Sequence, residues 1–565
     1  MQEFIASIES AIIAATGLEP GSFSLESPRK AELGDFAFPC FLLAKRDKGN
    51  PAQIAGKLAE QLNASLEGIQ ATATGPYINF QIDRSDLARS LLGSIRSQGA
   101  LYGNSEEGRG QTVVIDLSSP NIAKPMSVGH LRSTVIGAAI QRLHDALGYQ
   151  TVGINHIGDW GSQFGKLVAA VDRWGGEVDL ESDPIKALLE LYVRYHNEEA
   201  TDPSLQDAAR AAFQELESGK EGHVRAVWRR LTELSMQEFQ RTYERLHVHF
   251  DEIRGESFYE DHLGPIIERI VQSGVTEESE GALIVSLKEF GENVPPCLLR
   301  KSDGTTLYAT RDLAAAFHRW ELYHFARCLY VVGGDQRLHF QQLKYVLQRM
   351  GVEWEPKVEH IAFGMMRLPE GKMSTRKGQV VFLEDVLDRA VAEAAKIIAE
   401  KNPELANSAE VAEQVGVGAV IFNDLKRERV KDIEFVWSEV LSFEGDTGPY
   451  VQYTHARLLS ILTKADAGAI DAAPDWSALA DSAGLLLTLG QFPGVIRKAA
   501  THAEPSEVTQ YLLGLAREIN SWIAANRVLG QAPGVMAARL QLADAARIVL
   551  HKGLALLGVS APESM

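Results

Sequence analysis

The sequence predicts an α/β protein built around a Rossmann-type parallel sheet. A β-branched run, TVVIDLS at 112–118, is followed by a helical pattern to about Leu147 and by a second strand at TVGIN, which together make a βαβ unit. A charged, helical stretch at about 167–250 predicts an insertion between two halves of the sheet, and nearly everything beyond about 385 is helical. The predicted class is therefore α/β, a parallel-sheet domain with a helical insertion, an N-terminal α/β domain and a C-terminal all-α bundle.

The segments follow one another in a clear order. Residues 1–108 predict a compact α/β unit with an amphipathic first helix and extended stretches at GDFAFP and GPYINFQID. The loop LYGNSEEGRGQ separates this unit from the sheet domain, 109–385, whose second half resumes with CLYVVGGDQ, HFQQLKYVLQRMG and HIAFGMM. Helices continue through 386–444, and a new bundle, 445–565, starts near GDTGPYVQYTHARLLSIL.

Composition restricts the class of protein. The 565 residues include 56 basic and 75 acidic side chains, and the net charge of −19 argues against a protein that coats nucleic acid without specificity. The run LKRERVK at 425–431 has two interpretations, a local basic face or the solvated surface of a helix. Three separated cysteines, a start without a signal-sequence pattern and the absence of a long apolar run predict a cytoplasmic protein without a disulfide framework, a zinc site or a membrane span.

The stretch KPMSVGHLRST at 124–134 lies where the first strand of the predicted βαβ unit turns into its helix. A helix start offers unpaired N–H groups and the positive end of a dipole to a phosphate. Gly129 would let a nucleotide approach the backbone, His130 can donate a hydrogen bond, and Lys124 supplies a cation. Ser127 has two interpretations, a plain N-cap or a ligand of the phosphate.

A second basic loop, GKMSTRKG at 371–378, follows a predicted strand. Taken alone, a glycine-bracketed loop with three cations and two hydroxyls is more often a solvated turn than a binding site. Together with SVGH at 127–130, it resembles the signature of class I aminoacyl-tRNA synthetases, whose two motifs hold the triphosphate of ATP from two sides. The chemistry that this resemblance implies is in-line attack of an amino-acid carboxylate on the α-phosphorus, promoted by electrostatic stabilisation and positioning.

Further blocks, in the right order and along essentially the whole chain, resemble arginyl-tRNA synthetases: DLSSPNIAKPM, NHIGDWGSQFG, TTLYATRDLAAA, FGMMRLPEGKMSTRKG and FEGDTGPYVQYTHAR. The resemblance implies that 1–108 is an additional tRNA-binding domain, 109–385 the catalytic domain, 386–444 a helical junction domain and 445–565 an α-helical anticodon-binding domain. It implies catalytic roles for Lys124, His130 and Lys372. The implied ATP site consists of Ser127, Gly129, His130, Gly333, Asp335, Lys372, Met373 and Ser374.

An arginine substrate needs carboxylates and planar acceptors around its guanidinium group. Tyr308 and Asp312 are four residues apart and therefore face the same side of a helix start, where Asp312 would pair with the guanidinium. Asp116, at the end of the first strand, would bind charged groups of the substrate from the other wall. The resemblance implies an arginine pocket lined by Asp116, Ser119, Asn121, Tyr308, Asp312 and Gln336. GGDQ at 333–336 ends a strand where class I enzymes bind the ribose of ATP, so Asp335 is expected to hold its hydroxyls.

Two positions depart from the family pattern. The first histidine of the first motif is Ser127 here, and serine donates a hydrogen bond but carries no charge. The second lysine of the second motif is Thr375. In arginyl enzymes a lysine just ahead of the first motif is thought to substitute for it, and Lys124 occupies that place. Lys124 and His130 are therefore expected to serve ATP.

The resemblance implies an arginine–tRNA ligase, which forms arginyl-adenylate from L-arginine and ATP and transfers arginine to the 3′ end of tRNA(Arg). Mg²⁺ is expected to accompany ATP as substrate, and no tightly bound cofactor, residue-built metal site or membrane contact is expected of this cytoplasmic monomer. Tyr77 and Asn79 in GPYINF are expected to stack on a tRNA base and read its edge, although Tyr77 also suits a strand face. Two alternatives stay open: another class I synthetase or nucleotidyltransferase, and a synthetase-like RNA-binding protein that has lost catalysis, which only Ser127 suggests.

Overall fold

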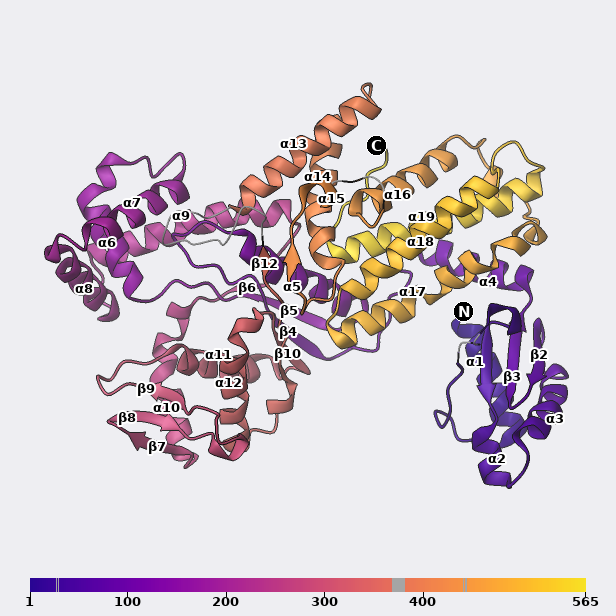
Figure 1. The fold of residues 1–565 in the computed structure, drawn as a ribbon, viewed down its shortest axis with the longest axis horizontal. Coiled ribbons are helices and arrows are strands. Elements are labelled where there is room, and N and C mark those ends of the chain that lie inside the picture. Colours follow the sequence, from indigo (N-terminus) through magenta and orange to yellow (C-terminus); the bar gives the residue numbers. More distant parts are fainter. Residues whose placement is uncertain (27, 29, 368–381, 441, 443–444) are drawn as a thin grey trace.

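The computed structural model describes residues 1–565 with the exception of 27, 29, 368–381, 441 and 443–444. Figure 1 shows an N-terminal α/β part set apart from a central sheet with its helices, a helical insertion at one end of the molecule and a helical bundle at the other. This arrangement confirms the predicted fold class.

The N-terminal part is a three-stranded antiparallel sheet, in the order β1-β3-β2, covered by helices. Its elements are α1 (Gln2–Thr16), β1 (Phe36–Pro39), α2 (Phe41–Asp47), α3 (Pro51–Asn63), β2 (Ile69–Thr74), β3 (Tyr77–Ile82) and α4 (Arg84–Gln98). Local sequence explains the start of α3, because Asn50 Oδ1 accepts a hydrogen bond from Ala52 N–H at 2.9 Å and Pro51 takes the first helical position. The stretches GDFAFP and GPYINFQID contain β1 and β3, whereas β2 was not predicted.

The central sheet has five parallel strands in the order β11-β10-β4-β5-β6. These strands are β4 (Thr112–Asp116), β5 (Gln150–Asn155), β6 (Glu252–Ile253), β10 (Arg327–Tyr330) and β11 (Val358–His360). Its helices are α5 (Val128–Ala146), α10 (Glu260–Gln272), α11 (Tyr308–Tyr323) and α12 (Arg337–Arg349). The chain runs from β4 through α5 to β5 on one side, while β10 lies on the other side of β4, so the strand order reverses between β4 and β10.

The insertion between β5 and β6 is helical, as predicted, and consists of α6 (Ser162–Trp174), α7 (Pro184–Glu198), α8 (Pro203–Glu217) and α9 (His223–Arg245). An unpredicted antiparallel sheet follows, formed by β7 (Thr276–Ser279), β8 (Ala282–Val285) and β9 (Cys297–Arg300). The stretch HIAFGMM is not one strand, because β11 ends at His360 and β12 (Met366–Arg367) pairs with β13 (Ile433–Glu434) outside the main sheet.

The C-terminal part is helical: α13 (Leu383–Lys401), α14 (Ser408–Leu425), α15 (Trp437–Val440), α16 (Gly448–Thr463), α17 (Ala483–His502), α18 (Ser506–Ala525) and α19 (Pro533–Leu557). α13 projects away from the body of the molecule (Figure 1). Because α14 ends at Leu425, the basic run at 425–431 is mostly the turn that follows this helix and is not a helix surface.

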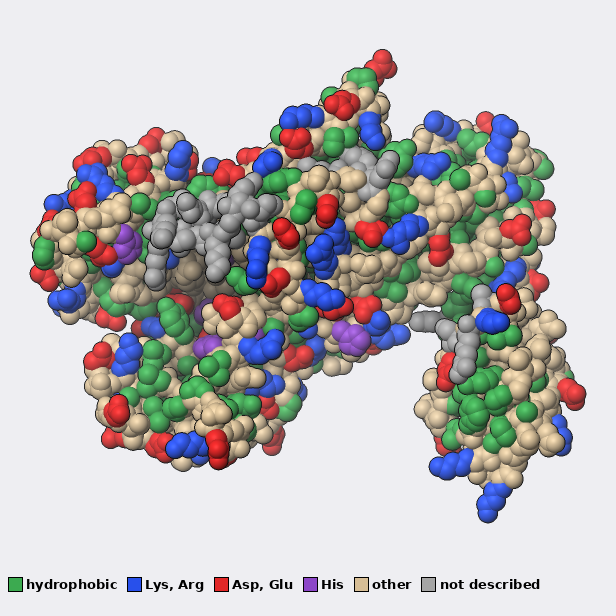
Figure 2. All heavy atoms as spheres, viewed as in Figure 1, with side chains coloured by type: hydrophobic (Ala, Val, Ile, Leu, Met, Phe, Trp, Pro, Cys, Tyr) green, Lys and Arg blue, Asp and Glu red, His purple; other side chains and the backbone are tan. Residues whose placement is uncertain are grey.

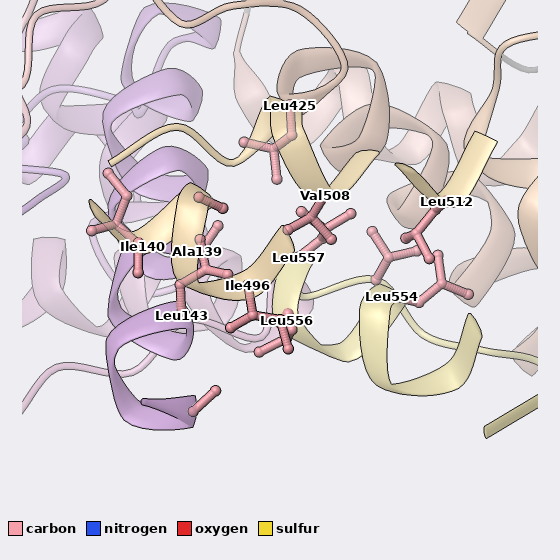
Figure 3. Close-up of a cluster of buried hydrophobic side chains, with 14 of the residues drawn as sticks. Ala139, Ile140, Leu143, Leu425, Ile496, Val508, Leu512, Leu554, Leu556 and Leu557 are labelled. Atoms are coloured by element: carbon pink, nitrogen blue, oxygen red, sulfur yellow. The ribbon is translucent and has the colours of Figure 1, made fainter. Parts of the chain in front are cut away.

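The bundle packs directly on α5, the helix that begins at the SVGH motif, 127–130. Figure 3 shows Ala139, Ile140 and Leu143 of α5 among apolar side chains from α14, α17, α18 and α19. The partners labelled there are Leu425, Ile496, Val508, Leu512, Leu554, Leu556 and Leu557. Since the opposite side of α5 packs on β4 and β5, the helix is enclosed between the sheet and the bundle.

One segment, Trp476–Thr501, is long and apolar enough to cross a membrane by length and composition. Here it forms a 3₁₀ helix and most of α17, and Leu486, Leu489 and Phe492 are completely buried in the core. A buried core helix of a bundle has the same composition, so this segment is explained by packing inside the protein.

Candidate active site

The first motif lies at the carboxyl ends of β4 and β10, where the strand order of the sheet reverses. Asp116, the last residue of β4, is in register with Tyr330 of β10 and Ile154 of β5. Ser133 of α5 joins the two strand ends, because its hydroxyl accepts from Ser118 N–H at 2.9 Å and donates to Val331 O at 2.6 Å. Such a reversal point is where open parallel sheets bind their ligands.

The loop between β4 and α5 has an unusual backbone. Ser118, Ser119 and Ala123 all have positive φ, at 72°, 52° and 58°, a conformation that costs about 1–3 kcal/mol for each non-glycine residue. Hydrogen bonds from neighbouring elements hold it: Ser119 N–H donates to Asn155 Oδ1 at 3.2 Å, and Ala123 N–H donates to the Ser235 hydroxyl at 2.8 Å. The loop is therefore held in place before any ligand binds.

Ser127 is the N-cap of α5 and forms a capping box with His130. Ser127 N–H donates to His130 Nδ1 at 3.0 Å, and since a backbone N–H can only donate, Nδ1 is the acceptor and the ring proton belongs on Nε2. Burial lowers the pKa of His130 to about 4, and the positive charge of Lys124 acts in the same direction. His130 is accordingly a neutral imidazole whose Nε2–H is a donor.

Lys124 and Gly129 complete the motif in different ways. Lys124 Nζ donates to Gln163 Oε1 at 3.1 Å and lies 5.5 Å from the ring centre of Tyr192, so this cation stands between the motif and helices α6 and α7 of the insertion. A Cβ at Gly129 would make only an ordinary contact with the Ser127 hydroxyl. Packing within the protein therefore does not require glycine at this position.

Asp116 already has a guanidinium partner within the protein. Arg319 Nη2 donates to Asp116 Oδ2 at 2.7 Å, both side chains are buried, and the Arg319 guanidinium lies 4.9 Å from the ring centre of Tyr330. The Ser119 hydroxyl donates to the other oxygen of Asp116 at 3.0 Å. Each carboxylate oxygen of Asp116 thus already accepts one hydrogen bond within the protein. Asn121 is an exposed neighbour whose backbone forms a bridge with Gly158.

Tyr308 and Asp312 both lie on the first turns of α11, as predicted from their spacing. Tyr308 is 66% exposed, whereas Asp312 is largely enclosed and its Oδ2 accepts from His339 Nε2 at 2.5 Å. Burial disfavours the Asp312 carboxylate, but the bond from His339 and the charges of His156 and Arg319 outweigh it and lower the pKa of Asp312. Asp312 is therefore a charged carboxylate beside the strand ends.

Glu256 is a second carboxylate at this place, which sequence reasoning missed. It begins the 3₁₀ helix Glu256–Tyr259 after β6, and its backbone N–H donates to Ile157 O at 3.0 Å. Burial raises the pKa of Glu256 to about 7, opposed by Arg311 and reinforced by the charges of Asp159, Asp312 and Glu260. Arg311 itself is hydrogen-bonded to Glu260, with 3.0 Å from Nε to Oε1. No sequence motif predicts its role, because the charges that act on Glu256, such as Asp312 and Arg311, come from elements distant in the sequence.

GGDQ follows β10 at the same edge of the sheet. Gly334 N–H donates to Phe363 O at 2.8 Å, and the residues from Gly334 to Gln336 form a single 3₁₀ turn. Asp335 and Gln336 are exposed beside Gly333, which forms a parallel bridge with Phe363. Lys372, Met373, Ser374 and Thr375 of the second motif lie outside the described residues.

Asn79 and Tyr77 of β3 line a cavity of about 100 Å³ in the N-terminal part. Asn79 is only 3% exposed, yet its Nδ2 has no hydrogen-bond partner among the described residues. Tyr77 packs edge-on against the exposed Phe41 at 5.7 Å between ring centres. Figure 2 shows hydrophobic side chains gathered on the visible face of this part of the molecule. A flat polar ligand would find both a ring and an unpaired donor here.

A larger cavity of about 480 Å³ lies between α13 and the C-terminal bundle, and it was not predicted from the sequence. It is lined by Ile397, Ile398, Lys401, Tyr450, Tyr453, Asn520 and Met565. Asn520 Nδ2 donates to the Thr454 hydroxyl at 2.8 Å and to the Tyr450 hydroxyl at 3.2 Å, so the polar wall is fixed, while Tyr453 is exposed. Both tyrosines belong to the block FEGDTGPYVQYTHAR, which is the only feature of the sequence analysis that pointed to this region.

Comparison with known proteins identifies three matching families. The catalytic domain of class I (R) tRNA synthetases matches 92–437, the DALR anticodon binding domain 451–565 and the arginyl tRNA synthetase N-terminal domain 2–82. An arginine–tRNA ligase of Leuconostoc citreum (strain KM20) is 47% identical over 544 residues, which cover 96% of this chain and 95% of the relative. One of Clostridioides difficile (strain 630) is 44% identical over the whole of both chains. The structure of the Thermus thermophilus arginyl-tRNA synthetase matches over all of both chains with a TM-score of 0.82 and 28% identity.

Proposed function

This chain belongs to the arginyl-tRNA synthetase family and is an arginine–tRNA ligase, and from that premise we propose how its residues divide the reaction. The ligase uses ATP to activate L-arginine and then esterifies tRNA. We assign 1–108 to tRNA binding, 109–385 to catalysis, 386–444 to a helical junction and 445–565 to the anticodon. The observation that carries the assignment of the site is that Asp312, held by His339 at the start of α11, is a charged carboxylate near the strand ends from which the first motif starts.

The ATP subsite is formed by the starts of two elements that follow β4 and β10. The N-terminus of α5 and the Nε2–H of neutral His130 face developing charge on the phosphates, and Lys124 contributes a full positive charge. Ser127 and Gly129 shape this turn, and Gly333 and Asp335 take the ribose. We assign Lys372, Met373 and Ser374 of the second motif to the same subsite. Mg²⁺ enters with ATP, coordinated by the phosphate oxygens.

The arginine subsite binds the guanidinium group between two carboxylates. His339 orients Asp312 through Oδ2 and leaves Oδ1 for the substrate, while Glu256 gains a positive partner and loses its proton when arginine binds. Tyr308 covers the site from the start of α11. Asp116 acts indirectly, since with Arg319 it holds Ser119 in place; Ser119, Asn121 and Gln336 then receive the amino and carboxylate groups.

The RNA is held at both ends of the molecule. Tyr77 stacks on a tRNA base and Asn79 donates its unpaired Nδ2–H to the edge of that base. The cavity between Tyr450, Tyr453 and Met565 takes an anticodon base. Because all these sites belong to one chain, a cytoplasmic monomer suffices for the reaction.

Aminoacylation of bulk tRNA with labelled arginine and pyrophosphate exchange with a panel of amino acids test this assignment. We expect exchange only with arginine, and only in the presence of tRNA(Arg), because in this family the RNA helps to order the active site. Full exchange without tRNA would refute that requirement. Exchange with another amino acid would refute the role of Asp312 and Glu256 as the guanidinium pocket, and RNA binding without exchange would mean a protein that has lost catalysis.

A further inference from the structure

Arg132 is completely buried, although it carries a full positive charge. It lies on α5 only two residues after His130. A buried charge is tolerated only when it is paired and hydrogen-bonded, so the partners of this guanidinium indicate what it holds together.

The Arg132 guanidinium contacts three segments that are far apart in the sequence. Nε donates to Asp424 Oδ1 of α14 at 3.0 Å, and neither side chain is accessible to solvent. Nη1 donates to Gly364 O at 2.6 Å, in the segment between β11 and β12, and to Lys431 O at 2.9 Å, in the turn after α14. The guanidinium also lies 5.7 Å from the ring centre of Phe363.

The segment 361–367 connects parts of the ATP subsite. Phe363 O accepts from Gly334 N–H of GGDQ, and β12 pairs with β13 immediately before the second motif begins in the sequence. Glycine at position 364 allows this segment to lie close to the backbone of Lys431, because a Cβ there would lie 2.5 Å from the carbonyl carbon of Lys431. Arg132 of α5 therefore fixes segment 361–367, which contacts GGDQ and precedes the second motif in the sequence.

Asp424 belongs to a helix on the bundle side of the molecule, since α14 packs against α16, α18 and α19. The pair is only partly satisfied: Arg132 Nη2 and Asp424 Oδ2 have no hydrogen-bond partner among the described residues. Burial raises the pKa of Asp424 to about 6 against the opposing charge of Arg132. Because unpaired buried polar atoms are costly, the bonds that Arg132 does make to α14 and to segment 361–367 are the ones that offset the burial of its charge.

We propose that Arg132 is a positioning residue for arginine activation, which with Asp424 holds segment 361–367 in register with α5 and so couples the position of the bundle to both ATP motifs. This inference rests on the proposed role of GKMSTRKG in ATP binding. It differs from a purely stabilising role, because it requires the rate of adenylate formation to change while arginine binding at Asp312 does not.

The test measures pyrophosphate exchange at saturating tRNA for Arg132→Lys and Asp424→Asn. Asp424→Asn keeps the shape of the side chain and one acceptor oxygen, and it is the variant that decides the question. We expect kcat to fall about tenfold to a hundredfold and KM for arginine to stay within about twofold. The double variant is expected to be no slower than the slower single variant, because both changes break one interaction.

Arg327→Lys is the matched control. Arg327 also joins the sheet to the bundle, through Glu359 and the carbonyl of Ala500, but at the amino end of β10, away from the motifs. We expect it to lower the melting temperature without a selective loss of kcat. The proposal is overturned if folded Asp424→Asn retains kcat within about twofold, or if its kcat falls no more than that of Arg327→Lys. Lys372→Ala distinguishes failure of the proposed function from failure of this inference. If Lys372→Ala retains full activity, the proposed role of the second motif in ATP binding is wrong, whatever the Arg132 variants show.

Discussion

At the scale of single residues, the two carboxylates that we propose for the arginine subsite differ because their neighbours differ. Asp312 receives a hydrogen bond from His339 and its pKa is lowered despite burial, whereas burial among other acids raises the pKa of Glu256 to about 7. One carboxylate is therefore charged before the substrate arrives, and the other becomes charged when a guanidinium group offers it a partner.

Asp312→Asn should sharply weaken the use of arginine. A buried guanidinium group would lose its ionic partner, at about 2–5 kcal/mol. The measurement is the KM for arginine in pyrophosphate exchange with tRNA present, and the KM for ATP is the internal control, since Asp312 is not part of that subsite. An unchanged KM for arginine would remove Asp312 from the pocket.

Lys124 should matter more for adenylate formation than Ser127. Lys124→Ala removes a cation where Thr375 already provides none, and should raise the barrier by about 2–4 kcal/mol. Ser127→Ala removes a neutral hydroxyl whose visible role is the capping box, worth about 1 kcal/mol. Single-turnover rates at saturating ATP and arginine, with tRNA, separate these effects, and thermal melts detect the lost cap.

Ser127→His restores the histidine of the family pattern and tests that departure directly. If Lys124→Ala keeps the parental rate while Ser127→Ala abolishes it, the order of importance is reversed. The serine would then have taken over the phosphate contact of the missing histidine.

At the scale of elements, the close packing of α5 on the end of β4 depends on a glycine. A Cβ at Gly137 would overlap the side chain of Leu117. Gly137→Ala should therefore destabilise the protein by about 1–3 kcal/mol through overpacking, although alanine is the better helix former. The melting temperature measures this effect.

Gly93→Ala is the control for that substitution. Gly93 lies in α4, is exposed, and a Cβ there would meet nothing within 4 Å. This variant should be neutral or more stable by about 0.5–1 kcal/mol. Equal melting temperatures of the two variants would mean that Leu117 moves to make room for the Cβ at position 137 without a loss of stability.

Elements with strong local patterns were predictable from the sequence, and elements defined by their partners were not. The run TVVIDLS and the helix after KPMSVGH announce β4 and α5 by composition and periodicity. β2, the sheet of β7 to β9 and the two-residue pair β12–β13 carry weak patterns and exist because a neighbouring strand completes their hydrogen bonds. For the same reason the shared helix start of Tyr308 and Asp312 was predictable from their spacing, while the contact of His339 with Asp312 and that of Arg319 with Asp116 were not.

At the scale of the whole molecule, stability depends on neutral histidines between its parts. His144 of α5 donates from Nδ1 to Ile140 O at 2.8 Å, and its Nε2 accepts from Arg327 at 3.1 Å. Burial lowers the pKa of His144 to about 4 from an ordinary value of 6.5. Its contribution to stability is therefore complete above pH 6.5 and is lost as the pH falls towards 4.

His144→Gln should make the melting temperature less sensitive to acid between pH 7 and pH 5. Glutamine can donate and accept a hydrogen bond but cannot take up the proton that the unfolded chain binds in this range, a difference worth up to about 3 kcal/mol at full protonation. His502→Gln, at an exposed histidine at the end of α17, is the control. Equal loss of stability in parent and His144→Gln on acidification would contradict this account.

The enclosure of α5 between sheet and bundle has a consequence for biosynthesis. When α5 leaves the ribosome, the helices that cover it, α17 with Ile496 and α19 with Leu557, are still hundreds of codons away. At a translation rate of about 5–20 residues per second, the apolar side of α5 is exposed for tens of seconds before the helices that bury it are synthesised. A chaperone that binds such a surface during translation would therefore meet this chain early and release it only when the last helix is made.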